Sequence, residues 1–195
     1  MLLLDADPAG GDVASGWLRG QVDATRGLLE LASARGVDDP APAIRAAALP
    51  IDDTGHRLVI SGVTDPARTP AMVPAWALAA TALSSLADAD PALDVLIDAG
   101  RLGTATDPSV LRRSADLVVL VCGSSLPAAT AARAAGARLT AEVGARLRLL
   151  VVAPGRHYAA GDFADATGVP LLATGDEVTD SPVLATAKLI DGAAA

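Results

Sequence analysis

Short runs of apolar residues alternate along this chain with longer stretches that are rich in alanine. Most of the short runs are apolar at consecutive positions, which is typical of strands buried on both faces of a parallel sheet. They predict six strands, over residues 2–4, 58–60, 95–97, 117–121, 147–152 and 169–172.

The stretches between these runs have the spacing of amphipathic helices. Helices are predicted over residues 26–34, 70–89, 107–114, 127–146, 159–167 and 181–190. Residues 36–56 carry several prolines and aspartates, and we expect them to form an insertion or excursion and not a linker between domains. The alternation predicts an α/β fold, with a mostly parallel, doubly wound sheet and helices on both faces. The length suits a single domain over residues 1–195.

The composition narrows the choice of fold and partner. The chain is 51% hydrophobic but only 2% aromatic, which disfavours an aromatic-rich β sandwich. Its formal net charge of -8 opposes nonspecific binding to nucleic acid or to an anionic membrane surface. We expect no apolar stretch to approach the roughly 20 residues that cross a bilayer, and no basic leader precedes the first strand. We therefore expect a cytoplasmic protein that does not bind membranes.

Carboxylates follow two of the predicted strands directly. The first strand leads into Asp5 and Asp7, and then into a turn containing Gly10 and Gly11. Ligands of open α/β sheets bind at the carboxyl ends of the strands. An aspartate at such a strand end can hold Mg²⁺ beside a nucleotide phosphate, although aspartates also end strands as turn formers.

The third predicted strand ends in the same way, at Asp98, and Gly100 follows two residues later. A second carboxylate from a neighbouring strand could add a contact to the same ion. The order and separation of the two segments therefore favour a metal and phosphate site over two unrelated turns.

These segments resemble the ParA/MinD family of deviant Walker-A ATPases, which belong to the SIMIBI class of P-loop NTPases. Residues 2–12 are similar to the family's switch strand with its Asp-x-Asp-Pro sequence, and residues 93–100 to its Walker-B strand. Ser114-Ala115-Asp116 resembles the start of the next strand, and the likeness continues in order to residues 168–171. The composition is similar to that of actinobacterial members in the branch that includes the pilus-assembly ATPases.

The resemblance implies a role for each matched residue. Asp5 would contact Mg²⁺ or its waters, Asp98 would hold the metal through water, and Asp7 would orient the water that attacks the γ-phosphate. Gly10 and Gly11 would form the first switch turn, and Gly100 would lie in the second. Pro154 would lie at the strand end that contacts adenine, where the asparagine used by many members is missing. The cofactor would be Mg-ATP if the whole site exists, and otherwise there would be none.

The phosphate-binding half of such a site is not recognisable in this sequence. A P-loop needs a glycine-rich turn and a lysine, and the one lysine, Lys188, follows no such turn. In the family, one strand and one helix with the P-loop precede the Asp-x-Asp-Pro strand, and Asp5 lies close to Met1. Three explanations stay open: a truncated product or misplaced start, a degenerate member that has lost phosphate binding, and a P-loop supplied by a partner chain.

The resemblance implies an ATPase, but without the Walker-A lysine we expect this chain to be inactive by itself. The missing strand would belong beside the Walker-B strand, so its absence favours a homodimer or a partner protein. The leading hypothesis is a ParA/MinD-like positioning or assembly switch, as in partitioning. The alternative is a nucleotide-independent scaffold or dimerisation module with the same fold. An unrelated Rossmann-type or flavodoxin-like enzyme is disfavoured because no Gly-x-Gly-x-x-Gly follows any strand.

Overall fold

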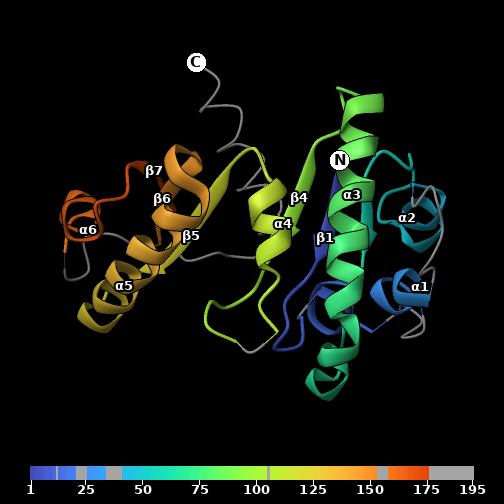
Figure 1. The fold of residues 1–195 in the computed structure, drawn as a ribbon, viewed down its shortest axis with the longest axis horizontal. Coiled ribbons are helices and arrows are strands. Elements are labelled where there is room, and N and C mark those ends of the chain that lie inside the picture. The colour runs from blue at the N-terminus through green and yellow to red at the C-terminus, as the bar shows by residue number, and fades with distance from the viewer. Residues whose placement is uncertain (12, 21–25, 34–40, 105, 153–157, 176–195) are drawn as a thin grey trace. The chain divides into compact units, whose positions relative to one another are not determined.

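The computed structural model describes residues 1–11, 13–20, 26–33, 41–104, 106–152 and 158–175. The chain divides into two compact units, Met1–Ser114 and Ala115–Ala195. Both units pack helices against parallel strands, so the predicted α/β class is confirmed (Figure 1). The strands fall into two sheets, one in each unit, and the single domain over 1–195 stays a prediction.

The sheet of the first unit has the strand order β2-β3-β1-β4. Its three parallel strands, β1 (Leu2–Asp5), β3 (Leu58–Ile60) and β4 (Val95–Asp98), were all predicted from apolar runs. β1 lies between the other two, and all four of its residues are buried. The register pairs Asp5 with Asp98, so these two residues end neighbouring strands at the same level.

Two elements of the first unit were not predicted, because both lie in the excursion over 36–56. The edge strand β2 (Leu49–Pro50) runs antiparallel to β3 and is only two residues long. Helix α2 (Ala41–Ala47) contains a proline near its start, where the missing N–H costs no hydrogen bond. The buried side chains of Ile44 and Ala47 anchor α2 in the core.

The core of the first unit forms between the sheet and its helices. These are α1 (Leu28–Ser33), α3 (Val73–Ala89) and α4 (Ser109–Ser114), with a π-helical turn over Val13–Trp17 and a 3-10 helix over Pro66–Met72. The prediction of a helix over 70–89 matches α3, whose Trp76, Ala79 and Leu83 are buried with Leu4 of β1 in one cluster.

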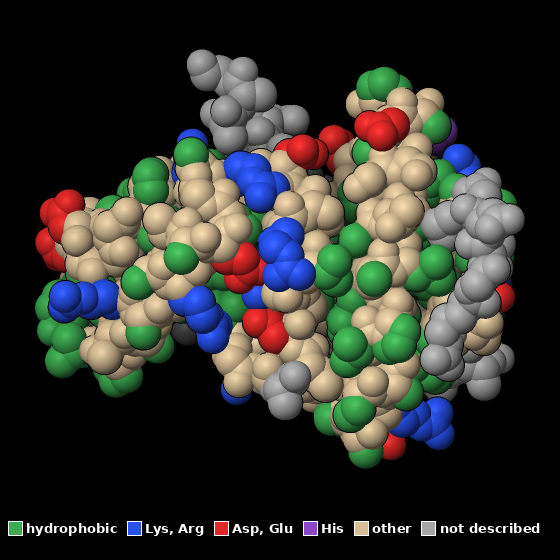
Figure 2. All heavy atoms as spheres, in the orientation of Figure 1, with side chains coloured by type: hydrophobic (Ala, Val, Ile, Leu, Met, Phe, Trp, Pro, Cys, Tyr) green, Lys and Arg blue, Asp and Glu red, His purple; other side chains and the backbone are tan. Residues whose placement is uncertain are grey.

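The helical stretch Pro66–Ala89 is 24 residues long and apolar enough, by length and composition, to cross a membrane. The expectation that no apolar stretch approaches that length was therefore wrong. Figure 2 shows hydrophobic side chains along α3 on the face in view. Its other side carries seven buried residues of the core, including Trp76, so α3 has the burial of a core helix.

The second unit contains the three-stranded parallel sheet β5-β6-β7. β5 (Val118–Gly123) and β6 (Leu147–Val152) match predicted strands, whereas β7 (Leu171–Gly175) begins two residues later than predicted. Helix α5 (Leu126–Val143), a 3-10 turn (Gly144–Arg146) and helix α6 (Ala160–Thr167) complete the unit. The Ser125 side chain accepts a hydrogen bond from the Ala128 N–H and caps α5. The helix predicted over 181–190 lies outside the described residues.

Two helical glycines of the second unit should respond to alanine in opposite ways. A Cβ on Gly136 of α5 would lie 3.0 Å from Val169 Cγ2 and 3.2 Å from the Thr167 carbonyl oxygen, whereas one on Gly161 of α6 meets nothing within 4 Å. Alanine favours a helix by up to about 1 kcal/mol over glycine. We expect Gly161→Ala to stabilise the unit and Gly136→Ala to destabilise it by about 1–2 kcal/mol, because a backbone oxygen cannot easily move away. Native-state hydrogen exchange of the β6 amides measures the change in stability caused by each substitution. Equal gains in stability from the two alanines would contradict the tight contact at Gly136.

Candidate functional site

The candidate site lies at the carboxyl edge of the parallel strands in the first unit. The chain leaves β1, β3 and β4 at this edge. The predicted residues Asp5 and Asp98 end β1 and β4, and Asp7, Gly10, Gly11 and Gly100 lie in the loops that follow these two strands. Parallel pairing requires this convergence, since the ends of parallel strands share one edge of the sheet. The predicted adenine contact, Pro154, lies outside the described residues.

Asp5 is the most constrained residue of the site. Its side chain is fully buried, and its Oδ1 accepts a hydrogen bond of 3.3 Å from the Asp7 N–H. Two glycines make room for the carboxyl group: a Cβ on Gly11 would lie 1.9 Å from Asp5 Oδ2, and one on Gly62 would lie 2.6 Å from Asp5 Cγ. Asp5 Oδ2 has no hydrogen-bond partner within the described part of the chain. The fold therefore encloses a carboxyl group and leaves one of its oxygens unsatisfied.

This burial changes the acidity of Asp5. The pKa of Asp5 is raised from 3.8 to about 6, and burial is the largest cause. The nearby Asp98 and Asp7 carboxylates contribute to the rise, and backbone hydrogen bonds from Asp7 and Gly62 oppose it. Both the buried environment and the neighbouring negative charges disfavour ionisation. A bound cation would reverse that balance, because it would stabilise the ionised form.

The loops after β1 and β4 contact each other through Asp7 and Gly100. Asp7 Oδ1 accepts a hydrogen bond of 2.8 Å from the Ala9 N–H, which closes the turn after β1. A Cβ on Gly100 would lie 2.2 Å from the same Oδ1, and Gly100 has a φ of +65°, so this position requires glycine on two grounds. The Gly100 N–H also donates a 2.9 Å hydrogen bond to Asp98 Oδ1. Each loop thus limits where the other can lie.

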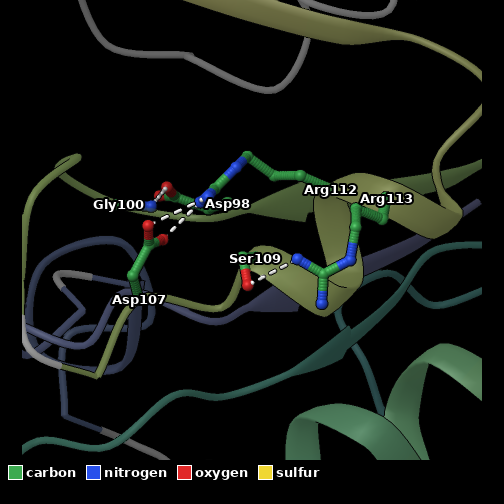
Figure 3. Close-up of polar contacts among 6 residues, drawn as sticks. All are labelled: Asp98, Gly100, Asp107, Ser109, Arg112 and Arg113. Carbon is green, nitrogen blue, oxygen red and sulfur yellow. Dashed lines mark hydrogen bonds and ion pairs between the residues drawn. The ribbon is translucent and has the colours of Figure 1, made fainter. Parts of the chain in front are cut away.

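An ion pair ties the end of the second loop to α4. Arg112, which is buried, donates from both terminal nitrogens to the Asp107 carboxylate, with the Nη2 to Oδ2 distance at 2.9 Å. Figure 3 shows the Arg112 side chain extending from α4 to Asp107, in the segment that follows Asp98. Bidentate arginine–carboxylate pairs fix orientation as well as distance. The pair therefore anchors the loop that carries Gly100.

The site offers carboxylates for a metal but no preformed metal cage. Among the described residues, no group of three or more His, Cys, Asp or Glu side chains could hold a metal ion. Asp5 and Asp98 together could still hold Mg²⁺ largely through water, as this ion commonly binds with one or two carboxylates. For the phosphates, the given sequence contains no glycine-rich loop with a lysine, and its one lysine, Lys188, lies outside the described residues.

Sequence reasoning missed three residues of the site. Gly62 follows β3 and faces Asp5, and the same strand-end rule could have found it, because Ser61-Gly62 comes directly after an apolar run. No pattern in the sequence pointed to Asp107 and Arg112, because they lie five positions apart and neither directly follows a strand. Their pairing depends on how the chain turns into α4.

No protein-family model matches the sequence, and no curated protein matches it either. Solved structures do match the fold. A ParA family ATPase from Chlorobium tepidum superposes with a TM-score of 0.70 at 13% identity, over 98% of this chain and 76% of that one. The cell division ATPase MinD of Pyrococcus furiosus gives 0.62 at 20% identity, over 98% and 75%.

This chain has the fold of the ParA and MinD ATPases. The MinC:MinD cell division protein complex of Aquifex aeolicus also matches, with a TM-score of 0.63 at 15% identity over 98% of this chain and 72% of the other. These superpositions establish the shared ParA/MinD fold. Because the sequence identities are low, the roles of the site residues stay predictions. The strands that end in Asp5 and Asp98 are neighbours in the sheet. This agrees with the resemblance, which rested on the order of these segments in the sequence.

The raised pKa of Asp5 predicts how stability depends on pH. The folded form holds the Asp5 proton up to about pH 6, whereas the unfolded form loses it near 3.8, so stability falls as pH rises from about 4 to about 6. Asp5→Asn removes this penalty, which is at most about 3 kcal/mol, and should be more stable than the wild type at pH 7 but not at pH 4.

Urea denaturation at both pH values, followed by fluorescence of the buried Trp76, measures this difference. Asp53→Asn, at an exposed turn, is the matched control and should change stability little at either pH. A difference between Asp5→Asn and wild type that stays constant from pH 4 to pH 7 would contradict the raised pKa.

The glycine cradle predicts a coupling between Gly62 and Asp5. Gly62→Ala should destabilise the first unit by about 1–3 kcal/mol, because its Cβ would overlap the Asp5 carboxyl group. In the Asp5→Ala background the same substitution should cost much less, since the overlapping atoms are gone. A double-mutant cycle by urea denaturation measures the coupling, and additive effects would show that the two residues do not touch.

Proposed function

We propose that this chain is a ParA/MinD-like positioning or assembly switch that keeps the metal side of a nucleotide site. The observation that carries the proposal is the pairing of Asp5 with Asp98 at the carboxyl ends of β1 and β4, within a ParA/MinD fold. In the proposed role, Asp5 and Asp98 hold the waters of Mg²⁺, and Asp7 orients the attacking water. The ion would neutralise charge on the phosphates and on the buried Asp5 carboxylate.

The proposed switch binds and hydrolyses ATP only when another segment supplies the phosphate-binding loop and its lysine. With 23 acidic and 15 basic side chains and a single lysine, the sequence has carboxylates for the metal but no P-loop for the phosphates. We place the chain in the pilus-assembly-type branch of the family and in the cytoplasm. It would act as a homodimer or with a partner protein, and the MinC:MinD complex is an example of such a partnership within the fold.

The second candidate function is a scaffold that never binds nucleotide. Its support is that polar groups of the site bind one another: Asp7 caps its own turn, Gly100 packs on Asp7, and Asp98 accepts the Gly100 N–H. A scaffold would use Asp5 and Asp98 only to fix the loops. The two functions differ in whether Asp98 binds a metal.

Calorimetric titration of the 195-residue chain with Mg-ATP tests the nucleotide side, and we expect no saturable heat up to millimolar ATP. Mn²⁺ binding, followed by electron paramagnetic resonance, tests the metal side. We expect weak, millimolar binding that Asp98→Asn reduces at least tenfold and that the exposed-turn control Asp53→Asn leaves unchanged. Micromolar ATP binding would contradict the missing phosphate half, and equal Mn²⁺ binding by the two variants would favour the scaffold.

A further inference from the structure

The segment that follows β3 lies against the turn after β1, and both belong to the first unit. Gly62 of this segment faces the Asp5 carboxyl group, and Thr64 and Pro66 lie beside Gly10 of the turn. A Cβ on Gly10 would lie 3.2 Å from Pro66 Cγ and 3.7 Å from the Thr64 carbonyl oxygen, and Gly10 has a φ of +96°. The turn after β1 therefore packs on this segment at two places.

Thr69 makes a third contact with the turn, through a hydrogen bond. Its hydroxyl donates to the Pro8 carbonyl oxygen at a distance of 2.9 Å. Both residues are buried, and Thr69 is only 1% exposed. A buried carbonyl oxygen without a hydrogen-bond partner is costly, so the turn is most stable where the Pro8 oxygen meets this hydroxyl. Thr69 thus fixes the direction of the Pro8 carbonyl.

The peptide group that Thr69 binds also binds Asp7. The Pro8 carbonyl and the Ala9 N–H are two ends of one planar peptide group, and they point in opposite directions. The Ala9 N–H donates to Asp7 Oδ1 at 2.8 Å. A rotation of this plane that broke the hydrogen bond to Thr69 would also turn the N–H away from Asp7. Hydrogen bonds connected in this way strengthen one another.

Thr69 is held more firmly than the turn that it binds. It lies in the 3-10 helix Pro66–Met72, whose two prolines restrict the backbone. This helix leads directly into α3, and its Met72 is buried in the core cluster. The turn contains Gly10 and Gly11, and glycine leaves the backbone free to adopt other conformations. The rigid helix therefore orients the turn, and not the reverse.

Packing alone does not require a hydroxyl at this position. Valine has nearly the same shape as threonine and has no polar group to bury. Helical threonines commonly donate to a carbonyl of the preceding turn of their own helix, as Thr81 does to Ala77 in α3. The Thr69 hydroxyl donates instead to a residue 61 positions away. Its hydrogen bond therefore serves the turn after β1.

We propose that Thr69 is a positioning residue for Asp7, and that it acts through the peptide group between Pro8 and Ala9. Its hydroxyl holds this peptide in the direction in which the Ala9 N–H restrains Asp7 Oδ1. The inference rests on the proposed function in one respect, since there Asp7 orients the attacking water. In the scaffold alternative, the same contacts hold Asp7 against Gly100 and so connect the two loops.

The first test needs no substitution. In the wild-type chain, we expect NMR to detect the Thr69 hydroxyl proton, because burial and the hydrogen bond to Pro8 slow its exchange with water. Thr81, which is exposed on α3, is the matched control, and its hydroxyl proton should exchange too fast to detect. Equally fast exchange of the two hydroxyl protons would overturn the proposal.

Substitutions test whether the hydroxyl acts on Asp7. Thr69→Val should speed hydrogen exchange of the Ala9 amide roughly fivefold or more, and that of the β1 amides less. Thr69→Ser keeps the hydroxyl and should restore the wild-type rate to within about twofold, and Thr81→Val should not change it. In the Asp7→Ala background the Ala9 N–H has lost its acceptor, so Thr69→Val should add less than about twofold.

Two results would show that Thr69 only stabilises the fold, and either would overturn the proposal. One is an equal acceleration of the Ala9 and β1 amides by Thr69→Val. The other is the same acceleration of Ala9 by Thr69→Val with and without the Asp7 carboxylate.

Mn²⁺ binding separates this inference from the proposed function. Unchanged Ala9 exchange in Thr69→Val, together with loss of Mn²⁺ binding in Asp98→Asn, would overturn the role of Thr69 and keep the proposed function. Faster Ala9 exchange in Thr69→Val, together with Mn²⁺ binding that Asp98→Asn leaves unchanged, would support the role of Thr69 within the scaffold.

Discussion

The burial of the Asp5 carboxyl group is the constraint on which the rest of the site depends. Asp5 ends the central strand β1, where every side chain is buried, and the group has room only because Gly11 and Gly62 lack side chains. A buried carboxyl with an unsatisfied oxygen is costly, and packing alone would favour an apolar residue at this position. Retaining it requires a compensating interaction, and a cation held between Asp5 and Asp98 would supply one. The protein is therefore less stable than it would be with an apolar residue at the end of β1.

The same constraint fixes the loops around the site. The turn after β1 must keep Gly11 on the Asp5 carboxyl, and Asp7 then closes that turn and lies against Gly100. The buried Arg112–Asp107 pair anchors the far end of the second loop to α4. A substitution at any of these contacts would displace residues at the ends of both β1 and β4, because the close packing leaves little space for neighbouring side chains to relax. In the proposed switch, a ligand at one loop would alter the other through these contacts.

The sequence by itself determined the parallel strands and most of the helices. Continuous apolar runs such as 2–4 and 58–60 favour burial, so their length and lack of polar positions carried enough information. It also determined that Asp5 and Asp98 end strands, because each carboxylate directly follows such a run. Local signals failed for α2, β2 and the start of β7, where prolines and short lengths hide elements that tertiary packing stabilises.

Only the tertiary structure decided which strand ends are neighbours, and therefore that Asp5 and Asp98 stand at the same level. It alone brought Gly62 against Asp5 and Gly100 against Asp7, since close approach depends on residues distant in the chain. Hydrophobic periodicity reports that a residue is buried, and it contains no information about which residue lies beside it.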